Sequence, residues 1–298
     1  MDFPHYDSLA GAITALFGST AAIEKSERLS GGDINKAFAL TLNNGERLFM
    51  KANARRDESF FTAEATGLSA IAQTAAIATP KIFCTGTDWT QCFLLLEYIE
   101  SSRPRSGFWE DFAHELAAMH NADPGNFTAP AHFGFFQDNF IGSSPQKNTP
   151  AAKWIDFFRD QRLVPQFRTA EAYFTNADRA KITKLLDRLG DFLTEPEHPS
   201  LLHGDLWRGS LMCRSDGKAV LIDPAVSVGN AEADLAMTEL FGGFPSSFYE
   251  AYREALPLQS GYEERRELYN LYQLLNHLNL FGSAYLHAVL GIVNKYVM

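Results

Sequence analysis

The stretch that most constrains this chain is residues 201–225, LLHGDLWRGSLMCRSDGKAVLIDPA, because it places two acidic residues around a predicted β-hairpin. LMC and AVLI predict two short strands, and the SDG between them is typical of a tight turn. Asp205 precedes the first strand and Asp223 follows the second. A hairpin brings these two positions to the same edge, so we expect the two carboxylates to lie close together. Such a pair suits a base that orients a hydroxyl and a ligand for Mg²⁺, the two parts that phosphoryl transfer needs most.

The spacing within this stretch resembles the protein-kinase catalytic loop, H-R-D-x-x-x-x-N followed later by D-F-G. HGDLWRGS begins with the same His-x-Asp, supplied by His203 and Asp205, and IDP takes the place of DFG. Five residues after Asp205 the chain has Ser210, where the pattern has Asn. A β-turn with solvated acids is the alternative interpretation of HGD alone, and the elements upstream argue against it.

The first hundred residues predict a small antiparallel sheet. Strands are expected at 23–29, 36–42 and 47–51, with SGGDIN and NNG as the turns between them. Gly31 and Gly32 lie in the first turn, where paired glycines let the backbone approach phosphates and point N–H groups at them. Most such turns are only turns, but strand, glycine turn, strand, turn and strand is the order of a kinase N-lobe.

A lysine ends the third of these strands. Lys51 is the candidate that binds the nucleotide phosphates, although a solvated strand-end lysine is an equally good interpretation of the residue alone. A helix expected at 60–72 offers Glu64 as the ion-pair partner that holds the lysine in place. Glu58 precedes this helix and is the less favoured partner.

The run QCFLLLEYIE at 91–100 is apolar without alternation, which is typical of a strand buried on both faces. Glu97, Tyr98 and Ile99 at its end are expected to connect two lobes and to offer backbone groups to an adenine edge. A plain strand end followed by a linker is the other interpretation. We therefore place an N-lobe at 1–99 and a C-lobe at 100–298.

The chain is mostly helical after this boundary. His114 and His120 lie in a predicted helix, and we expect surface or capping histidines because no third metal ligand is spaced to join them. Asp234 begins a later helix and either braces the catalytic loop or interacts only with the helix dipole.

Composition excludes several classes of function. The net charge of −10 and the pI near 5.3 argue against nucleic acid as the main partner. No apolar run is long enough to span a membrane, and the first residues do not resemble a signal peptide. Three scattered cysteines indicate reduced core thiols in a cytoplasmic protein.

Several motifs together resemble the fructosamine kinase (ketosamine-3-kinase) family. They are HGDLWRGS, IDPA, FGFFQDNFIGS, WIDFFRDQRL, FGGFPSSFYEAY and LLNHLNLFGSAYL, and they extend over nearly the whole chain. Trp207 within HGDLW separates this family from aminoglycoside and choline phosphotransferases. The resemblance implies an α+β, two-lobed, protein-kinase-like fold with a small N-lobe sheet, one key helix and a larger helical C-lobe. It also implies ATP-dependent phosphorylation of a sugar hydroxyl, usually O3, of ketosamines such as ribulosamine, erythrulosamine or fructosamine, free or attached to protein lysines, in deglycation.

The resemblance assigns a role to each matching residue. Asp205 corresponds to the catalytic base and Asp223 to the principal Mg²⁺ ligand, while Lys51 and Glu64 correspond to the phosphate-binding lysine and its helix partner. Trp207 corresponds to a tryptophan beside the base that can stack on a sugar, with a buried core tryptophan as the alternative.

Two positions depart from the family pattern HGDLWSGN. Arg208 replaces Ser and adds positive charge, and Ser210 replaces the Asn that binds or positions metal. A serine hydroxyl remains an oxygen ligand for Mg²⁺, reaching it by a loop shift or through a water. A nucleotide-binding pseudokinase is therefore one alternative. A kinase for another small hydroxylated amine, of the aminoglycoside or choline type, is the other, because the overall acidity suits cationic amines equally well.

Overall fold

The computed structural model describes residues 3–30, 35–54, 58–89 and 91–297, which form two compact units. The first unit comprises Met1–Phe108 and Leu211–Pro224, and the second comprises Trp109–Ser210 and Ala225–Met298. Each unit is described below by itself.

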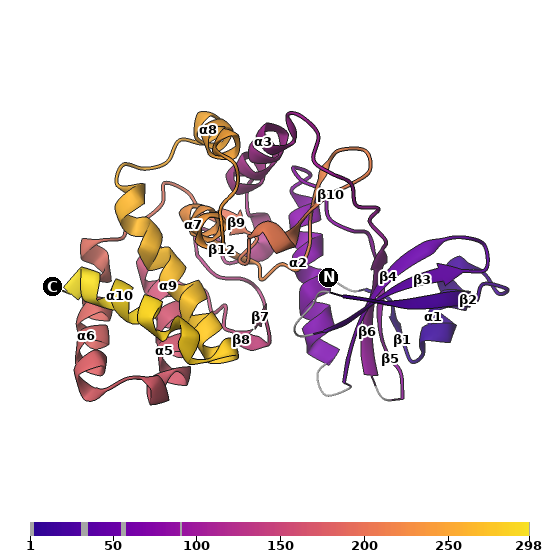
Figure 1. Cartoon of the computed structure of the whole chain (residues 1–298), viewed down its shortest axis with the longest axis horizontal. Coiled ribbons are helices and arrows are strands. Elements are labelled where there is room, and N and C mark those ends of the chain that lie inside the picture. The colour runs from indigo at the N-terminus through magenta and orange to yellow at the C-terminus, as the bar shows by residue number, and fades with distance from the viewer. Residues whose placement is uncertain (1–2, 31–34, 55–57, 90, 298) are drawn as a thin grey trace. The chain divides into compact units, whose positions relative to one another are not determined.

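A six-stranded sheet forms the first unit (Figure 1). Its strands are β1 (His5–Tyr6), β2 (Ile23–Leu29), β3 (Lys36–Leu42), β4 (Arg47–Ala54), β5 (Ile82–Thr87) and β6 (Gln91–Glu97). Their order is β1-β5-β6-β4-β3-β2, with β1 parallel to β5 and the other pairs antiparallel. The predictions for β2 and β3 are confirmed at both ends, and β4 continues three residues beyond Lys51.

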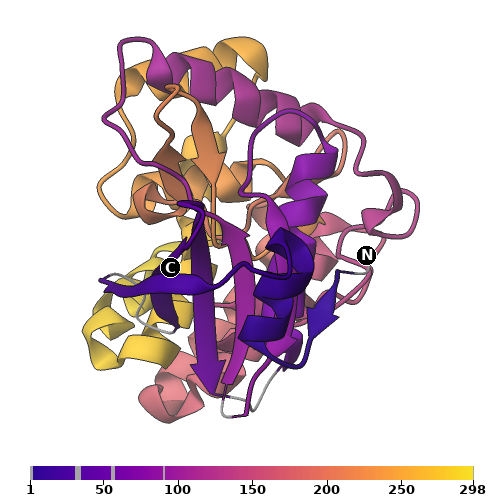
Figure 2. The same ribbon diagram turned by 90° about the vertical axis from the view of Figure 1, so that its right-hand side faces the viewer.

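Helices α1 (Leu9–Phe17) and α2 (Glu58–Gln73) cover this sheet, whose strands are seen from another side in Figure 2. Phe93 and Leu95 of β6 belong to the core that includes Ile13 of α1. Leu94, on the opposite face of β6, packs in a second cluster with Phe61 of α2. The prediction that β6 is buried on both faces is confirmed, because successive side chains of a strand point to opposite faces.

The predicted hairpin, β10 (Leu211–Cys213) paired with β11 (Ala219–Leu221), belongs to the first unit. The Leu221 N–H donates to the Ala78 carbonyl at 2.9 Å, and the Ser102 N–H donates to the Cys213 carbonyl at 2.8 Å. The two compact units therefore differ from the lobes expected at 1–99 and 100–298. The first unit extends to Phe108 and also includes residues 211–224, which contain the hairpin and Asp223.

The second unit is mainly helical (Figure 1). Its main helices are α3 (Phe108–Asn121), α4 (Trp154–Phe157), α5 (Val164–Thr169), α6 (Asn176–Asp187), α7 (Glu232–Leu240), α8 (Ser246–Ala255), α9 (Tyr262–Phe281) and α10 (Leu286–Val297). Short strand pairs join them: β7 (Asn139–Ile141) with β8 (Ser144–Gln146), and β9 (Ser200–Leu202) with β12 (Ser227–Gly229). Helix α9 contacts α5, α7 and α10, and its buried side chains supply much of the core.

A π-helical turn, Phe158–Leu163, joins α4 to α5, so the helical stretch across these three elements is continuous but irregular. Among the described residues, no helix is both long enough and apolar enough to cross a membrane.

Candidate active site

Lys51 is the centre of a buried ion-pair cluster in the first unit. Its side chain on β4 is 10% exposed, and its Nζ donates to Glu64 Oε1 of α2 at 2.5 Å. The same Nζ also donates to Oδ1 of Asp223, which follows β11. Glu58 instead accepts a hydrogen bond from Thr87 at 2.9 Å. The structure thus brings together three residues that are far apart in the sequence and that the motifs had singled out.

The charge of Lys51 is maintained by this cluster. Burial disfavours an ammonium group, but the carboxylates of Asp223 and Glu64 outweigh that effect and hold the pKa of Lys51 above its usual value. Lys51 is therefore a permanent cation at physiological pH, as binding of phosphates requires.

Asp223 has an uncommon backbone conformation. Its φ is +58°, in the left-handed region, where non-glycine residues other than Asn and Asp are strongly disfavoured. Its side chain is half exposed while Lys51 engages one of its oxygens. Strained backbone of this kind is concentrated at functional sites, where the surrounding structure holds it in place.

The expected connector lies at the end of β6. Glu97 accepts from the Lys81 N–H at 3.1 Å, and the Arg47 guanidinium lies 3.8 Å from the centroid of the Tyr98 ring. Ile99 is buried. Their role in adenine binding stays a prediction, and the glycine pair Gly31–Gly32 lies outside the described residues.

The HGD loop in the second unit follows β9 and is held from several sides. Gly204 has φ +84°, and a Cβ there would lie 2.0 Å from the Ala225 carbonyl oxygen, so only glycine fits. Its carbonyl accepts from the Gln273 side chain of α9 at 2.9 Å. The Asp205 N–H donates to His203 Nδ1 at 3.3 Å. The backbone on both sides of Asp205 is thereby fixed, as a positioned base requires.

Asp234 braces this loop from α7, which confirms that interpretation of the residue. Its carboxylate accepts from the backbone N–H of His203 at 2.6 Å and of Gly204 at 2.9 Å. Although burial favours the neutral acid, the hydrogen bonds from His120 and Gly204 lower the pKa of Asp234, which stays ionised.

The prediction that His120 is a surface or capping residue is wrong, whereas His114 is exposed as expected. His120 is fully buried because it completes the brace. Its Nε2 lies 3.2 Å from Asp234, and its Nδ1 lies 2.6 Å from the Tyr252 hydroxyl. Burial raises the pKa of Tyr252 well above its usual value, so Tyr252 is the donor to Nδ1 and the Nε2–H donates to Asp234. No local motif signals this contact, which joins α3, α7 and α8.

The three remaining predicted residues follow Asp205 directly. Trp207 is 42% exposed, which excludes a core tryptophan. Arg208 lies with its guanidinium 5.4 Å from the Trp109 ring centroid. Ser210 is buried, and its hydroxyl donates to the Asp205 carbonyl at 2.6 Å. Ser210 therefore closes the loop on Asp205, while its oxygen lone pairs remain able to accept.

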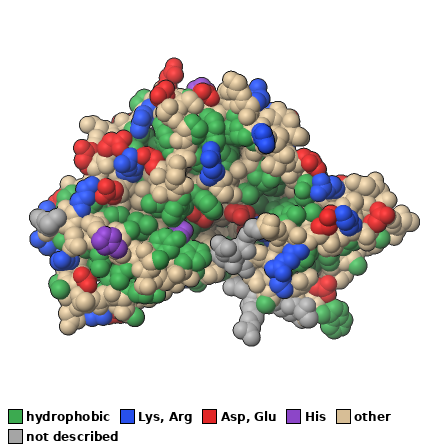
Figure 3. All heavy atoms as spheres, in the orientation of Figure 1, with side chains coloured by type: hydrophobic (Ala, Val, Ile, Leu, Met, Phe, Trp, Pro, Cys, Tyr) green, Lys and Arg blue, Asp and Glu red, His purple; other side chains and the backbone are tan. Residues whose placement is uncertain are grey.

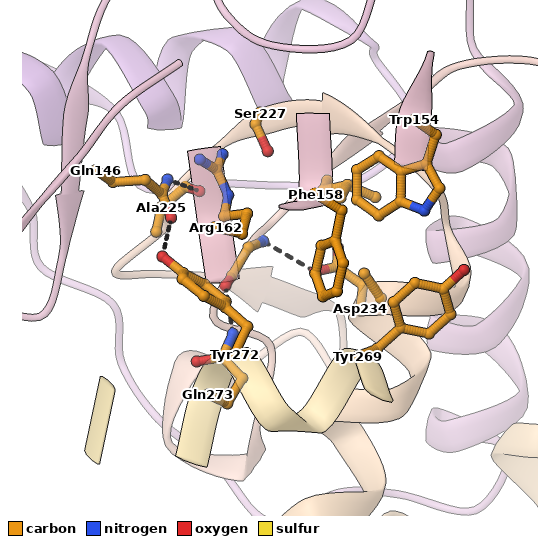
Figure 4. A pocket seen from close by; sticks show the side chains of 13 residues that line it. Gln146, Trp154, Phe158, Arg162, Ala225, Ser227, Asp234, Tyr269, Tyr272 and Gln273 are labelled. Carbon is orange, nitrogen blue, oxygen red and sulfur yellow. Dashed lines mark hydrogen bonds between the residues drawn. The ribbon is translucent and has the colours of Figure 1, made fainter. Parts of the chain in front are cut away.

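A cavity of about 30 Å³ lies behind the HGD loop (Figure 4). Gly204 and Asp234 border it, together with Arg162, Tyr272 and Gln273. This volume fits about one water molecule and not a sugar or a nucleotide. The cavity is therefore part of the support of the loop.

Arg162, on the π-helical turn, is a buried cation in this support. It donates to Asn148 Oδ1 at 2.7 Å and to the Lys147 carbonyl at 2.6 Å, and burial lowers its pKa to about 10. Tyr272 lies between charges of opposite sign. Burial raises its pKa to about 12, with Arg162 lowering it and Asp205 raising it. Arg162 lies within the motif WIDFFRDQRL, although no role was predicted for it, and Tyr272 lies in none of the motifs.

Comparison with known proteins identifies the family. The family model described as fructosamine kinase matches residues 6–298. The chain belongs to the fructosamine kinase family. A "Probable ketoamine kinase" of Synechocystis sp. is 39% identical over 282 residues, covering 94% of this chain and 92% of that protein. A "Protein-ribulosamine 3-kinase, chloroplastic" of Oryza sativa subsp. indica is 37% identical, covering 94% and 81%.

A solved structure shares the fold as well as the family. The crystal structure of "Putative fructosamine-3-kinase" from Haemophilus somnus 129PT superimposes with a TM-score of 0.87 at 30% identity, covering 98% of this chain and 97% of that one. The α+β, kinase-like fold expected from the motifs is therefore confirmed, as is membership of a kinase family that uses ATP.

Phosphoryl transfer in protein kinases relies on Mg²⁺, and some residues of this chain have the chemistry to hold that ion. Mg²⁺ prefers hard oxygen ligands and binds through one or two carboxylates, retained waters and substrate phosphates. In the first unit, Asp223 has a half-exposed carboxylate of this kind. In the second unit, the hydroxyl oxygen of Ser210 can also act as a ligand.

Proposed function

We propose that this fructosamine kinase family member transfers the γ-phosphoryl group of ATP to a sugar hydroxyl, O3, of ketosamines such as ribulosamine, erythrulosamine or fructosamine. The observation that carries the proposal is the cluster of Lys51, Glu64 and Asp223. A buried permanent cation between two carboxylates suits the binding of phosphates and metal. The choice of ketosamines is supported by the family.

Each of the candidate residues would have a separate role in the reaction. Asp205 would orient the substrate hydroxyl and accept its proton as the oxygen attacks the γ-phosphorus and the bond to ADP breaks. Lys51 would bind the phosphates, and Glu64 keeps Lys51 in place. Asp234 would act only through the loop, as a positioning residue.

Asp223 would be the main ligand of Mg²⁺, and Ser210 a weaker one directly or through a water. When bound, Mg²⁺ would neutralise phosphate charge. Glu97, Tyr98 and Ile99 would lie along the adenine, with Gly31 and Gly32 near the phosphates. Trp207 and Arg208 would contact the ketosamine.

We also propose that ketosamines on protein lysines are substrates, as the names of the ribulosamine kinase relatives suggest, and that the reaction occurs in the cytoplasm. Free buried thiols at all three cysteines support a reducing compartment.

The deciding experiment is ATP turnover, with Mg²⁺ present, against ribulosamines, fructosamines, aminoglycosides and choline. We expect turnover of ketosamines only. Phosphorylation of an aminoglycoside or choline without ketosamine turnover would favour the related small-molecule kinases. ATP binding without transfer to any acceptor would favour a pseudokinase.

Asp205→Asn tests the assignment of the base. General-base catalysis contributes about 10²–10⁴-fold to rate, so we expect at least that loss in kcat with ATP affinity nearly unchanged. Asp187→Asn, the same change at an exposed acid on α6, is the control. Wild-type rates in the Asp205 variant would show that another group accepts the proton.

A further inference from the structure

A row of partly exposed rings begins at Trp207 and continues across the second unit. We call it the aromatic ledge: Trp207, Phe241, His277, Phe281 and Tyr285. Successive ring centroids lie 6.4 Å apart from Trp207 to Phe241, 4.8 Å from Phe241 to His277, and 5.4 Å from His277 to Phe281. Tyr285 lies 5.1 Å from His277. The rings are therefore in contact along the whole row.

Three of these rings are exposed, and the other two, His277 and Tyr285, are half-buried. Trp207 is 42% exposed, Phe241 36% and Phe281 50%, three of the six most exposed large hydrophobic side chains found among the described residues. Figure 3 shows hydrophobic side chains gathered over the C-terminal end of α9, where Phe281 ends the helix. A contiguous exposed apolar surface on a single protein is usually a binding surface.

The ledge is tied rigidly to the catalytic loop. Gln273, His277 and Phe281 are spaced four residues apart and so share one face of α9. Gln273 donates to the Gly204 carbonyl, next to Asp205, at 2.9 Å. At 1.5 Å per residue, Phe281 lies about 12 Å farther along the helix. The ledge therefore starts beside the expected base and leads away from it.

The ledge carries no permanent charge. His277 is its only titratable group near neutral pH, and its Nδ1–H donates to the Gln273 carbonyl at 2.8 Å. Burial lowers the pKa of His277, although the bond to Gln273 acts in the opposite direction, so the ring is neutral at physiological pH. A neutral aromatic surface suits apolar groups and, on ring faces, a single cation.

We propose that the aromatic ledge binds the N-substituent of the ketosamine, an apolar or aromatic group carried on its amine. This inference rests on the proposed function. In a ketosamine the amine nitrogen is on C1, and only C2 separates C1 from the carbon that bears O3. If O3 is at Asp205 and Trp207 contacts the ketosamine, as proposed above, the cationic amine lies near Trp207, and its substituent points away from the base. The ledge is the continuous surface that begins there.

The test compares two ketosamines that differ only in this substituent: the ribulosamines of methylamine and of phenethylamine. We expect the wild-type protein to prefer the phenethyl compound in kcat/KM, mainly through KM. Phe281→Ala should reduce that preference about three- to tenfold, because one aromatic contact is lost. Phe136→Ala, a ring of similar exposure with no contact to the ledge among the described interactions, is the matched control and should keep the preference.

Calorimetric binding of the same two compounds separates this inference from the proposed function. If neither compound is phosphorylated, the proposed function is wrong. If the two compounds also bind with equal affinity, the proposed binding of the N-substituent to the ledge is wrong as well. If both compounds are phosphorylated with equal kcat/KM, or if Phe281→Ala leaves the preference intact, the proposed function stands and only the proposed role of the ledge is wrong. A Phe281→Ala variant that changes oligomeric state instead, measured by sedimentation, would assign the ledge to self-association.

A ribulosyl-lysine in a peptide carries the same ketosamine group as a free ribulosamine, so a pair of peptides tests whether the ledge also binds protein substrates. A ribulosyl-lysine within a Leu- and Phe-rich peptide should be preferred over one within a Gly- and Ser-rich peptide, and Phe281→Ala should reduce this preference too. If the protein prefers the apolar substituent in the small ketosamines but shows no preference between the peptides, the ledge binds only free ketosamines.

Discussion

At the scale of single residues, Asp223 combines a charge with a backbone conformation that few residues accept. The left-handed φ of +58° favours Asp and Asn, while the carboxylate neutralises Lys51 and is the proposed ligand of Mg²⁺. Mutation can remove the charge of this residue while keeping its backbone conformation.

Asp223→Asn should remove activity at any practical Mg²⁺ concentration but keep the backbone conformation. Asp223→Ala should also be inactive and, in addition, be less stable than the Asn variant by about 1 kcal/mol, because alanine disfavours a positive φ. Urea unfolding of both variants without nucleotide measures the difference. Equal stability would show that the left-handed conformation is not under strain in the Ala variant.

Ser210 allows a second prediction at this scale. Ser210→Ala leaves the partly buried Asp205 carbonyl without the Ser210 hydroxyl donor, so we expect a loss of about 1 kcal/mol in stability. We also expect a moderately higher Mg²⁺ concentration for half-maximal rate. Ser210→Asn should lower that Mg²⁺ concentration, because the longer amide reaches the ion. Mg²⁺ titrations measure both effects. An unchanged or weaker Mg²⁺ dependence in the Asn variant would show that the loop is built around serine.

At the scale of elements, the HGD loop depends on helices from distant parts of the chain. Helix α7 supplies Asp234, α9 supplies Gln273, and α3 and α8 hold Asp234 through His120 and Tyr252. A loop held by several partners can keep a base in one geometry, and correct positioning of a catalytic group contributes strongly to rate.

Asp234→Asn should destabilise the protein by about 2–4 kcal/mol near pH 7, because an amide oxygen replaces a carboxylate that accepts from two buried N–H groups. The folded pKa of Asp234 lies below its ordinary value of 3.8, so this stability is present above that pH and is lost as the pH falls through the folded pKa. The difference between wild type and variant should therefore shrink below about pH 4.

Urea unfolding at several pH values measures this change, with the exposed Asp187→Asn on α6 as the control. A difference that stays constant down to pH 3 would show that Asp234 does not titrate in the folded state as described. A kcat that falls while KM is unchanged would show that Asp234 acts through the position of Asp205.

At the scale of the whole molecule, neither compact unit is a continuous segment. The chain leaves the first unit after Phe108, returns with the hairpin at residue 211 and leaves again after Pro224. Lys51 and Asp223 are therefore joined only when both segments of the first unit are folded together.

ATP with Mg²⁺ at about 100 times its Kd should stabilise the wild-type protein by about 2.7 kcal/mol. Asp205→Asn should keep nearly all of this stabilisation. Lys51→Met should lose most of it and also unfold more easily without ligand, because two carboxylates are left without their cation. Thermal unfolding with and without nucleotide measures both. Full stabilisation of the Lys51 variant would remove the lysine from the nucleotide site.

The sequence by itself determined the local elements and the family, and it predicted the site. Strands β2 and β3 were predicted with their observed bounds, and β6 with burial on both faces, because strand periodicity and turn chemistry depend on neighbouring residues. The motifs also singled out Asp205, Asp223, Lys51 and Glu64 as candidates, since phosphoryl transfer needs these residue types. Three of them, Lys51, Glu64 and Asp223, are in contact in the structure.

Only the tertiary structure decided what surrounds them. His120 was expected at the surface and is buried against Asp234, the hydroxyl of Ser210 is directed at the Asp205 carbonyl, and the rings from Trp207 to Phe281 form one surface. The reason is physical: these contacts join residues from separate helices and loops. Their geometry is set by the packing of whole elements, which no short stretch of sequence encodes.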